Sequence, residues 1–457
     1  NTVVGDEAGT AITTGDYNTA LGYQAGTAVT TGLYNVAVGG ASLLANTTGA
    51  SNVAIGTSTL ASNTTASSNT AVGYASLNAN TTGTLNTAVG KDAGLSVTTG
   101  VQNTFVGGLS GDAITTANSN VAVGYNTLST NTVGHRNTAI GENALATHNV
   151  ASAANTYNTA VGYSAGVDIT TGTNNTLIGG LAGDAINTGY DNVAVGYLAL
   201  SAATTASNNT AVGHAALNAN TTGTVNTAVG TDALRSNTTA NHNTAVGYKA
   251  LDVNTTGTLN TGLGSNALLL NTTGSNNTAV GFGSLDANTT GNSNVALGYN
   301  SMSTETTGAG NVAVGTNALA TQNTTAVSYN TGVGHNAGLS VTTGVQNTLI
   351  GGLAGDALTE SDFNTAVGHL ALSSDTLGSR STAIGMNTLR DQNFTSPTET
   401  YNVAVGHGAG LLVTTGTHNT LIGGLAGDAL TDADSNVAVG YNSLSSNTLG
   451  SACTAVG

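Results

Sequence analysis

The sequence predicts an all-β fold, a parallel β-solenoid built from coils of 17 residues. The motif Asn-Thr-Ala-Val-Gly, or a close variant, begins at residue 1 and returns every 17 residues as far as residue 137. It continues to residue 453, with three longer steps at 137–158, 311–330 and 381–402. Gly occupies the fifth position of all 27 copies, and Val, Ile or Leu the fourth. A short fixed period indicates one structural unit stacked on copies of itself.

The period also decides the expected domain organisation. A length of 457 residues alone would suggest several globular domains. The motif, however, runs through the whole chain without a linker, so we expect residues 1–457 to form a single continuous solenoid of about 27 coils. Charged residues make up 6% of the chain, against about 25% in an ordinary globular domain. The regularly placed Thr, Val and Ile argue against disorder.

Each coil is expected to hold two short strands and two turns. Counted from the Asn of the motif, positions 2–4 carry the β-branched or small residues that favour a strand. The Gly at position 5 ends this strand, where the backbone needs a positive φ or a close approach. Positions 8–11 are expected to form the second strand, and positions 12–15, often Asn-Thr-Thr-Gly, the second turn.

A covariation between positions 9 and 12 predicts a packed interior. In 16 of the 26 full coils position 9 is Leu or Met, and in the other ten it is Gly. In those ten coils position 12 becomes large and apolar: Ile12, Val29, Val97, Ile114, Ile169, Ile186, Val341, Leu358, Val413 and Leu430. One large apolar group per coil is therefore expected, supplied from either position, because an empty or overfilled core is destabilising. The Asn at position 1 is expected to form a hydrogen-bonded ladder between coils.

The three longer steps add residues near 147–157, 322–329 and 391–401. They are expected to be surface bulges, and Pro397 falls in the last one, outside any strand ladder. A longer repeat overlies the short one. The sequence Gly-Gly-Leu-Ala/Ser-Gly-Asp-Ala occurs at 107–113, 179–185, 351–357 and 423–429, so a block is duplicated at a spacing of 244 residues.

The repeat Asn-Thr-Ala-Val-Gly-x-x-Ala-Leu-x-x-Asn-Thr-Thr-Gly at 209–223, and with Ser at its eighth position at 69–83, resembles known repeats. It is similar to the head repeats of YadA-like trimeric autotransporter adhesins and to repeats of phage tail-fibre proteins. The resemblance covers essentially the whole chain. It implies a left-handed parallel β-roll, three chains side by side as a homotrimer, and an extracellular place on a virion or cell surface. So thin a coil buries little by itself, which also favours lateral association.

Charge and motif content narrow the function. The formal net charge of −16 disfavours nucleic acid and anionic membranes, which need a basic surface. No apolar run is long enough to insert into a membrane. No nucleophile–base pair, carboxylate pair or metal-ligand spacing stands out, so we expect no enzyme, no cofactor and no metal site.

Two groups of residues are candidate contact sites. Position 6 is often aromatic, and such a column either stacks on sugar rings or packs between chains. Its members are Tyr23, Tyr74, Tyr125, Tyr163, Tyr197, Tyr248, Phe282, Tyr299 and Tyr441. The second group lies in the Gly-Gly-Leu coils, where positions 3 and 7 are enlarged and are expected to meet another chain. Its members are Phe105, Leu109, Leu177, Leu181, Leu349, Leu353, Leu421 and Leu425.

These observations predict a structural or adhesive fibre shaft on a virion or bacterial surface, a rigid spacer that presents or contacts a host receptor or glycan. One alternative is a solenoid that binds ice or another crystal through columns of Thr at positions 2, 13 and 14. Against it, position 2 mixes Thr with Val and is expected to point inward. A glycan-degrading surface spike is the other alternative, although the sequence offers no acidic pair for that chemistry.

Overall fold

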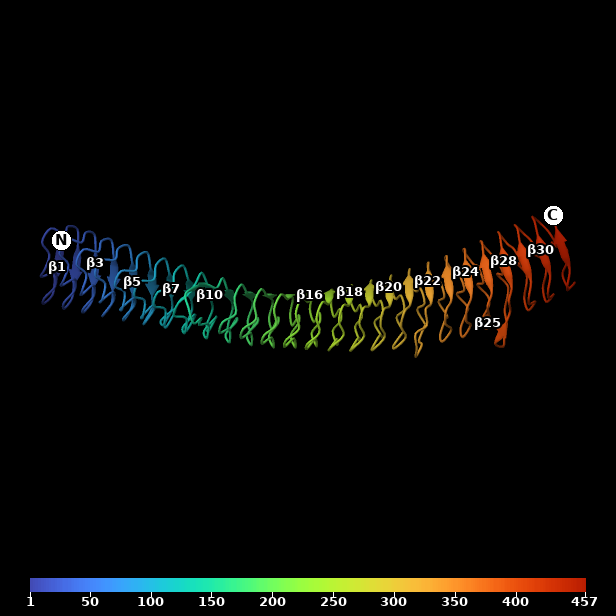
Figure 1. Ribbon diagram of the computed structural model, residues 1–457. Coiled ribbons are helices and arrows are strands. Elements are labelled where there is room, and N and C mark those ends of the chain that lie inside the picture. Colours follow the sequence, from blue (N-terminus) through green and yellow to red (C-terminus); the bar gives the residue numbers. More distant parts are fainter. The chain divides into compact units, whose positions relative to one another are not determined.

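A computed structural model describes all residues, 1–457, as a parallel β-solenoid of about 27 turns without any α-helix. The fold class predicted from the period is confirmed. The chain divides into two compact units, Asn1–Asn226 and Thr227–Gly457. In each unit one short strand per turn stands beside the strand of the next turn, so that the strands form a row (Figure 1).

Unit 1 contains thirteen three-residue strands that pair in parallel. They are β1 (Thr2–Val4), β2 (Thr19–Leu21), β3 (Val36–Val38), β4 (Val53–Ile55), β5 (Thr70–Val72), β6 (Thr87–Val89), β7 (Thr104–Val106), β8 (Val121–Val123), β10 (Thr138–Ile140), β12 (Thr159–Val161), β13 (Thr176–Ile178), β14 (Val193–Val195) and β15 (Thr210–Val212).

Unit 2 repeats this arrangement with fourteen strands. They are β16 (Thr227–Val229), β17 (Thr244–Val246), β18 (Thr261–Leu263), β19 (Thr278–Val280), β20 (Val295–Leu297), β21 (Val312–Val314), β22 (Thr331–Val333), β23 (Thr348–Ile350), β24 (Thr365–Val367), β26 (Thr382–Ile384), β28 (Val403–Val405), β29 (Thr420–Ile422), β30 (Val437–Val439) and β31 (Thr454–Val456).

The strand register aligns equal positions of successive coils. Thr70 pairs with Thr87, Ala71 with Ala88 and Val72 with Val89. The middle residue, position 3, points into the coil, and Ala71 is completely buried. Positions 2 and 4 lie on the outer face, partly or largely exposed. The expectation that position 2 points inward is therefore wrong. A coil this thin has room for Ala next to the strand, and the larger Val or Thr faces outward.

The Gly at position 5 is required by backbone geometry. Gly73 has a φ of +129°, and an added Cβ would lie 2.5 Å from the carbonyl oxygen of Gly90 in the next coil. Both the positive φ and the close approach expected from the sequence are thus present.

The predicted second strand at positions 8–11 is absent. Leu43, at position 9 of its coil, has a left-handed φ of +49°, and Ala41, at position 7 just before the segment, has a φ of +55°. Their N–H groups still bond to neighbouring coils, but in opposite directions. Ala41 N donates to Tyr23 O at 2.9 Å, whereas Leu43 N donates to Thr59 O at 3.0 Å. The segment is therefore a hydrogen-bonded wall of turns, and each coil has one strand.

The exchange of apolar volume in the interior is confirmed. Leu77, at position 9 of its coil, is completely buried, as is Val97 at position 12 of a coil whose position 9 is Gly94. A Cβ on Gly94 would lie 3.0 Å from Leu77 Cδ2 and 2.8 Å from Phe105 Cδ2. The glycine thus leaves space that neighbouring side chains fill.

The expected Asn ladder is also confirmed. Asn69 Oδ1 accepts a hydrogen bond from Asn86 N at 2.9 Å, and Asn69 Nδ2 donates to Gly83 O at 2.9 Å. The side chain also donates to Asn52 Oδ1 at 3.3 Å. These amides are completely buried, so the ladder satisfies backbone groups that strand pairing leaves free.

The inserted residues of the longer coils lie at the turn remote from the strands. In unit 1, β9 (Gly134–His135) pairs with β11 (Ala154–Asn155), and in unit 2, β25 (Gly378–Ser379) pairs with β27 (Thr398–Glu399). Figure 1 places β25 on the opposite side of unit 2 from its row of strands. The third insertion is held by a bridge between Ala309 and Val327.

Candidate functional site

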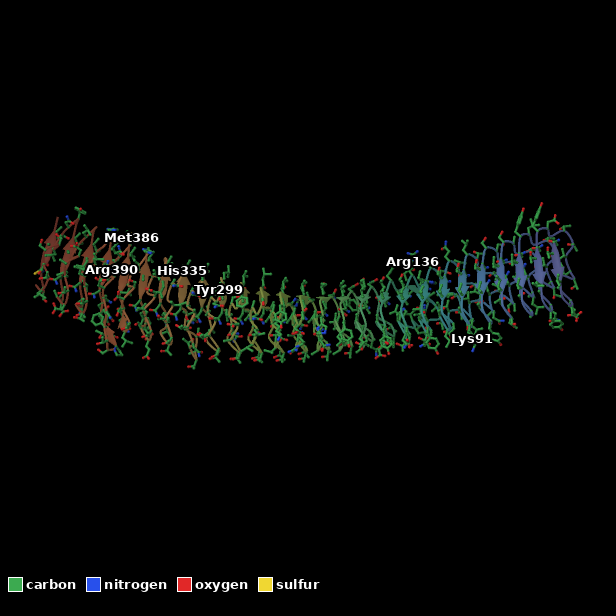
Figure 2. The ribbon with its side chains drawn as sticks, turned by 180° about the vertical axis from the view of Figure 1, so that it is seen from behind. Lys91, Arg136, Tyr299, His335, Met386 and Arg390 are labelled. Atoms are coloured by element: carbon green, nitrogen blue, oxygen red, sulfur yellow. The ribbon has the colours of Figure 1, made fainter.

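The aromatic column at position 6 lies on the surface. Its nine predicted members are each at least half exposed. Phe282 and Tyr299 stack with ring centroids 5.7 Å apart, and Tyr197 lies 5.8 Å from the ring of His214. Figure 2 shows Tyr299, with His335 and Met386 from the same column, following one another along one side of unit 2. An exposed column of this kind is available to a ligand or to another chain.

A second exposed column, at the last residue of each coil, was missed by the sequence reasoning. Tyr17 and Tyr34 stack in it with centroids 5.0 Å apart and planes 4° apart. Residues here adopt left-handed backbone conformations, for example Tyr17 with a φ of +60°. The signal in the sequence is an aromatic residue directly before the first Asn of a coil. It occurs at Tyr17, Tyr34, Tyr157, Tyr329, Phe363 and Tyr401.

The predicted inter-chain contacts divide into two sets. Four of them are completely buried inside their own chain: Phe105, Leu177, Leu349 and Leu421. Their expected contact with another chain is therefore wrong. Each occupies position 3, the inward position, and fills space left by nearby glycines. A Cβ on Gly111 would lie 2.4 Å from Phe105 Cε1, and one on Gly183 would lie 2.8 Å from Leu177 Cδ2.

The other four are partly exposed and remain predictions. Leu109, Leu181, Leu353 and Leu425 occupy position 7, with φ values of +56° to +57°. Three nearby carboxyl groups, those of Asp112, Asp184 and Asp356, have pKa values raised first by burial. Nowhere do three His, Cys, Asp or Glu side chains gather in a metal-binding arrangement.

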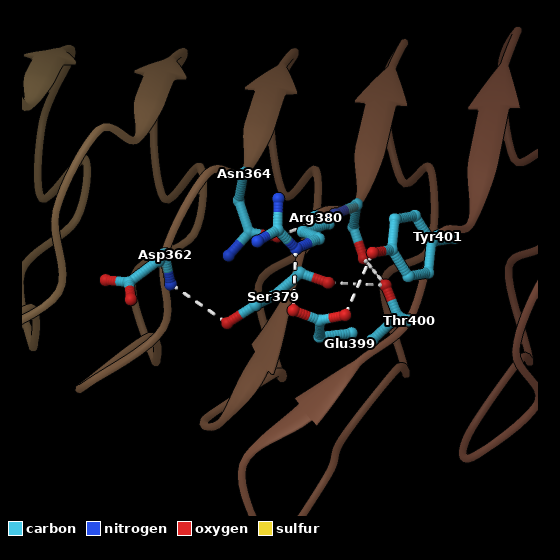
Figure 3. Close-up of polar contacts among 8 residues, drawn as sticks. Asp362, Asn364, Ser379, Arg380, Glu399, Thr400 and Tyr401 are labelled. Carbon is cyan, nitrogen blue, oxygen red and sulfur yellow. Dashed lines mark hydrogen bonds and ion pairs between the residues drawn. The ribbon is translucent and has the colours of Figure 1, made fainter.

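The most structured polar cluster on the surface lies at the bulge of unit 2 (Figure 3). Arg380 Nε donates to Glu399 Oε1 at 3.0 Å, and the Tyr401 hydroxyl donates to Glu399 Oε2 at 2.8 Å. The Tyr401 hydroxyl and the Arg380 guanidinium together hold the pKa of Glu399 below its ordinary value. The guanidinium also lies 4.6 Å from the ring centre of Phe363 and 5.8 Å from that of Tyr401.

This cluster borders an open hollow of about 160 Å³. The lining combines the charged and aromatic groups of three successive coils, namely Asp362, Phe363, Arg380, Pro397 and Glu399. Asp362 is fixed through its backbone N, which donates to Ser379 Oγ at 3.0 Å, and through Oδ1, which accepts from Val345 N at 2.7 Å. Its Oδ2 makes no hydrogen bond. The hollow thus holds charged groups whose positions are set by the coil framework.

The duplicated block places a related cluster in unit 1. Arg136 Nη1 donates to the Tyr157 hydroxyl at 2.8 Å, and the guanidinium lies 5.6 Å from the Tyr157 ring centre. These two residues precede Arg380 and Tyr401 by the 244-residue spacing. The Arg–Tyr pair is therefore common to both bulges and accompanies their shared backbone insertion.

The side chains at these sites are not arranged as in a catalytic centre. The carboxylates of the hollow are paired or exposed, and no nucleophile lies beside a base. The structure offers no apolar helix of membrane-spanning length. No family model, curated protein or solved structure matches the chain.

Proposed function

We propose that the chain is the shaft of a surface fibre, a rigid spacer on a virion or bacterial cell that presents or contacts a host receptor or glycan. In this proposal copies of the chain associate side by side through the outer faces of their strands. The resemblance to YadA-like heads and tail-fibre repeats implies that three chains associate, that the coils form a left-handed β-roll and that the fibre is extracellular.

The observation that carries the proposal is the uncharged outer face of each unit, in which an apolar column at position 4 lies beside a column of Thr and Val at position 2. Position 4 is Val, Ile or Leu in every coil, and no charged residue occurs at positions 1–5. Several position-4 side chains are more than a third exposed, among them Ile55 at 40% and Ile178 at 39% in unit 1, and Ile350 at 38% and Ile422 at 40% in unit 2. A row of exposed apolar side chains along a whole unit marks a candidate interaction surface.

The size of this face suits a specific interface. Strands lie about 4.8 Å apart, and three residues span about 10 Å, so the thirteen strands of unit 1 present on the order of 600 Å². A standard interface buries about 800 Å² per partner, so each unit alone approaches that value. Three copies of an uncharged face can also meet around a threefold axis, because no like charges face one another there.

Native mass spectrometry and analytical ultracentrifugation test the proposal. We expect a particle three times the mass of one chain. The variant Ile55→Lys/Ile178→Lys places two cations on the outer face, and it should dissociate the particle while the β-sheet circular dichroism persists. Thr48 and Thr171 are exposed turn residues. The control Thr48→Lys/Thr171→Lys adds the same charge there and should leave the particle intact. A strictly monomeric wild-type chain would refute the proposal.

One observation favours a second candidate, a surface that binds ice or another crystal. Position 2, which is Thr in 19 of 27 coils, lies on the outer face and not inside. The Thr hydroxyls therefore form runs with the strand spacing of about 4.8 Å, interrupted where position 2 is Val, and such runs resemble the arrays that a lattice can match. Thermal hysteresis of a dilute solution would support this candidate, and its absence would remove it.

A further inference from the structure

We propose that the hollow at the bulge of unit 2 is a binding site for one residue of a neutral saccharide. It lies between Asp362, Phe363, Arg380, Pro397 and Glu399, which three successive coils contribute. The site belongs to one chain, so it stands or falls independently of the association proposed above.

Unused hydrogen-bonding groups face the hollow from two sides. Arg380 uses only Nε, towards Glu399, and its two Nη atoms make no hydrogen bond. Asp362 Oδ2 is likewise free, because only Oδ1 accepts from Val345 N. The Glu399 side chain is 58% exposed. Neighbouring sugar hydroxyls match this set, because each hydroxyl donates to a carboxylate and accepts from a guanidinium.

Charge selects a neutral ligand over an anionic one. Two carboxylates, Asp362 and Glu399, border the hollow against one guanidinium, and the chain carries a formal charge of −16. A sialic or uronic acid would therefore meet net repulsion. Phe363, 40% exposed, adds an apolar ring surface beside the polar groups. The C–H face of a pyranose ring packs against the part of this ring that the Arg380 guanidinium, 4.6 Å from its centre, leaves open.

Comparison of the two bulges distinguishes the residues that hold the backbone insertion from the residues available to a ligand. In unit 1, Asn118 Oδ1 accepts from Val101 N at 2.8 Å, and Asn118 N donates to His135 Nδ1 at 2.9 Å, which repeats the bonding of Asp362. The same backbone hydrogen bonds therefore form without a carboxylate at this position. At the 244-residue spacing, Asn118, Ser119 and Asn155 stand where unit 2 has Asp362, Phe363 and Glu399. The two acidic groups and the aromatic ring are additions that the insertion does not require.

The volume sets the size of the ligand portion. At about 160 Å³ the hollow is smaller than the pockets of roughly 300–1,000 Å³ that enclose small molecules. It therefore accommodates one sugar ring of a longer glycan, with low affinity per site. In the proposed fibre three copies would act together and raise the avidity. That gain rests on the proposed function, whereas the binding of a single ring does not.

Saturation-transfer difference NMR of the full chain tests the site with methyl glycosides of glucose, galactose, mannose and N-acetylglucosamine. Sialic acid serves as the anionic probe. We expect transfer to at least one neutral glycoside and weaker transfer to sialic acid. The variant Asp362→Asn/Phe363→Ser/Glu399→Asn copies the unit 1 residues and should fold. It should lower the affinity about tenfold or more, because it removes hydrogen bonds to charged groups.

Substitution in unit 1 gives the matched control. Asn155→Ala changes the position equivalent to Glu399 in the other bulge and should leave saccharide binding unchanged. The site is refuted if no neutral glycoside shows transfer, if transfer is as strong in the triple variant, or if sialic acid binds best. Because ultracentrifugation of the same samples reports association, failure of saccharide binding and failure of the fibre proposal are separate results.

Discussion

Gln392 Nε2 donates a hydrogen bond of 2.6 Å to Asp375 Oδ2 inside unit 2, where both side chains are completely buried. The carboxylate also accepts from Gly378 N at 3.0 Å and Phe394 N at 3.2 Å. Both residues occupy position 12, and Gln392 belongs to the coil with the 391–401 insertion. The carboxylate therefore accepts from the turn of its own coil, at Gly378, and from the coil with the insertion, at Gln392 and Phe394.

The buried carboxyl of Asp375 predicts a specific pH dependence. Burial raises its pKa above the ordinary value of 3.8. The folded protein therefore holds this proton more tightly than the unfolded chain. The resulting stabilisation is complete below pH 3.8 and is lost as the pH rises through the folded pKa. Asp375→Asn removes the titration, so we expect its thermal midpoint to fall less than that of the wild type between pH 3.5 and 7.

The control for this comparison is Asp191→Asn, which removes an exposed carboxyl from unit 1. Circular dichroism melts at matched ionic strength measure all three proteins. An Asp375→Asn variant whose midpoint follows the wild-type pH profile would contradict the assignment. Asp375→Ala should be destabilised at every pH by roughly 3–5 kcal/mol, because it leaves the partners of the carboxylate buried and unpaired.

Packing between Phe105 and Gly111 predicts strong coupling between two substitutions. Phe105→Ala opens a cavity and should cost about 3–5 kcal/mol. Gly111→Leu alone collides with the Phe105 ring, because even a Cβ would lie 2.4 Å from Cε1. Together they place Ala at position 3 and Leu at position 9, as in ordinary coils, in which Leu128 adopts the same left-handed conformation with a φ of +51°. Ile114 still fills position 12, so the double variant relieves the collision with Phe105 but keeps a second large apolar group in the coil.

We therefore expect the double variant Phe105→Ala/Gly111→Leu to be more stable than the sum of its single variants by about 1 kcal/mol or more. Denaturant unfolding of the four proteins gives the coupling energy directly. Additive effects would show that the two positions do not share one space.

The sequence predicted the features that repeat with the coil and are determined by local packing. Gly73, the Asn69 ladder and the Leu77 interior follow from position-specific constraints visible in one chain. The orientation of the strand was not predicted, because apolar Val72 looked like the interior residue and Ala71 like a filler. In a coil this narrow the small residue faces inward. The predicted second strand is absent because Leu43 adopts a left-handed backbone conformation, which its residue type does not indicate.

The sequence did not predict the surface cluster at the bulge of unit 2, for a different reason. Up to 21 residues of sequence separate Arg380, Glu399 and Tyr401. The coil with the insertion brings their side chains into contact. The position of the insertion near 391–401 was visible. Which side chains meet there depends on how the extra residues pair β25 with β27, and no period describes that pairing.

The Asn ladder predicts that alanine substitution destabilises the protein much more at position 1 than at the exposed turn position of the same coil. Asn69→Ala leaves Asn86 N and Gly83 O without their partners in the interior, and should cost roughly 2–5 kcal/mol. Thr82, at the exposed turn position of the same coil, serves as the control. Thr82→Ala should change stability by no more than about 0.5 kcal/mol. Equal melting temperatures for the two variants would contradict a stabilising ladder.

His148 predicts acid sensitivity of the opposite sign to Asp375. It is completely buried at position 12 of the coil with the 147–157 insertion, close to the backbone of Thr170 and without a well-formed hydrogen bond at either ring nitrogen. Burial lowers its pKa from 6.5 to about 4. The unfolded chain therefore takes up this proton first, so stability present above pH 6.5 is lost as the pH falls towards 4. The loss is on the order of 3 kcal/mol.

His148→Asn should remove most of that acid sensitivity. Asn is the residue found at position 12 in many coils, including Asn131 of the preceding one, so the variant keeps a side chain that the interior accepts. At pH 7 we expect its thermal midpoint to equal or exceed that of the wild type, because a buried imidazole without a well-formed hydrogen bond is replaced by an amide that can bond to its own turn. Melts from pH 7 to 4 measure the difference. If both proteins lose the same stability over this range, the imidazole is not the group that titrates.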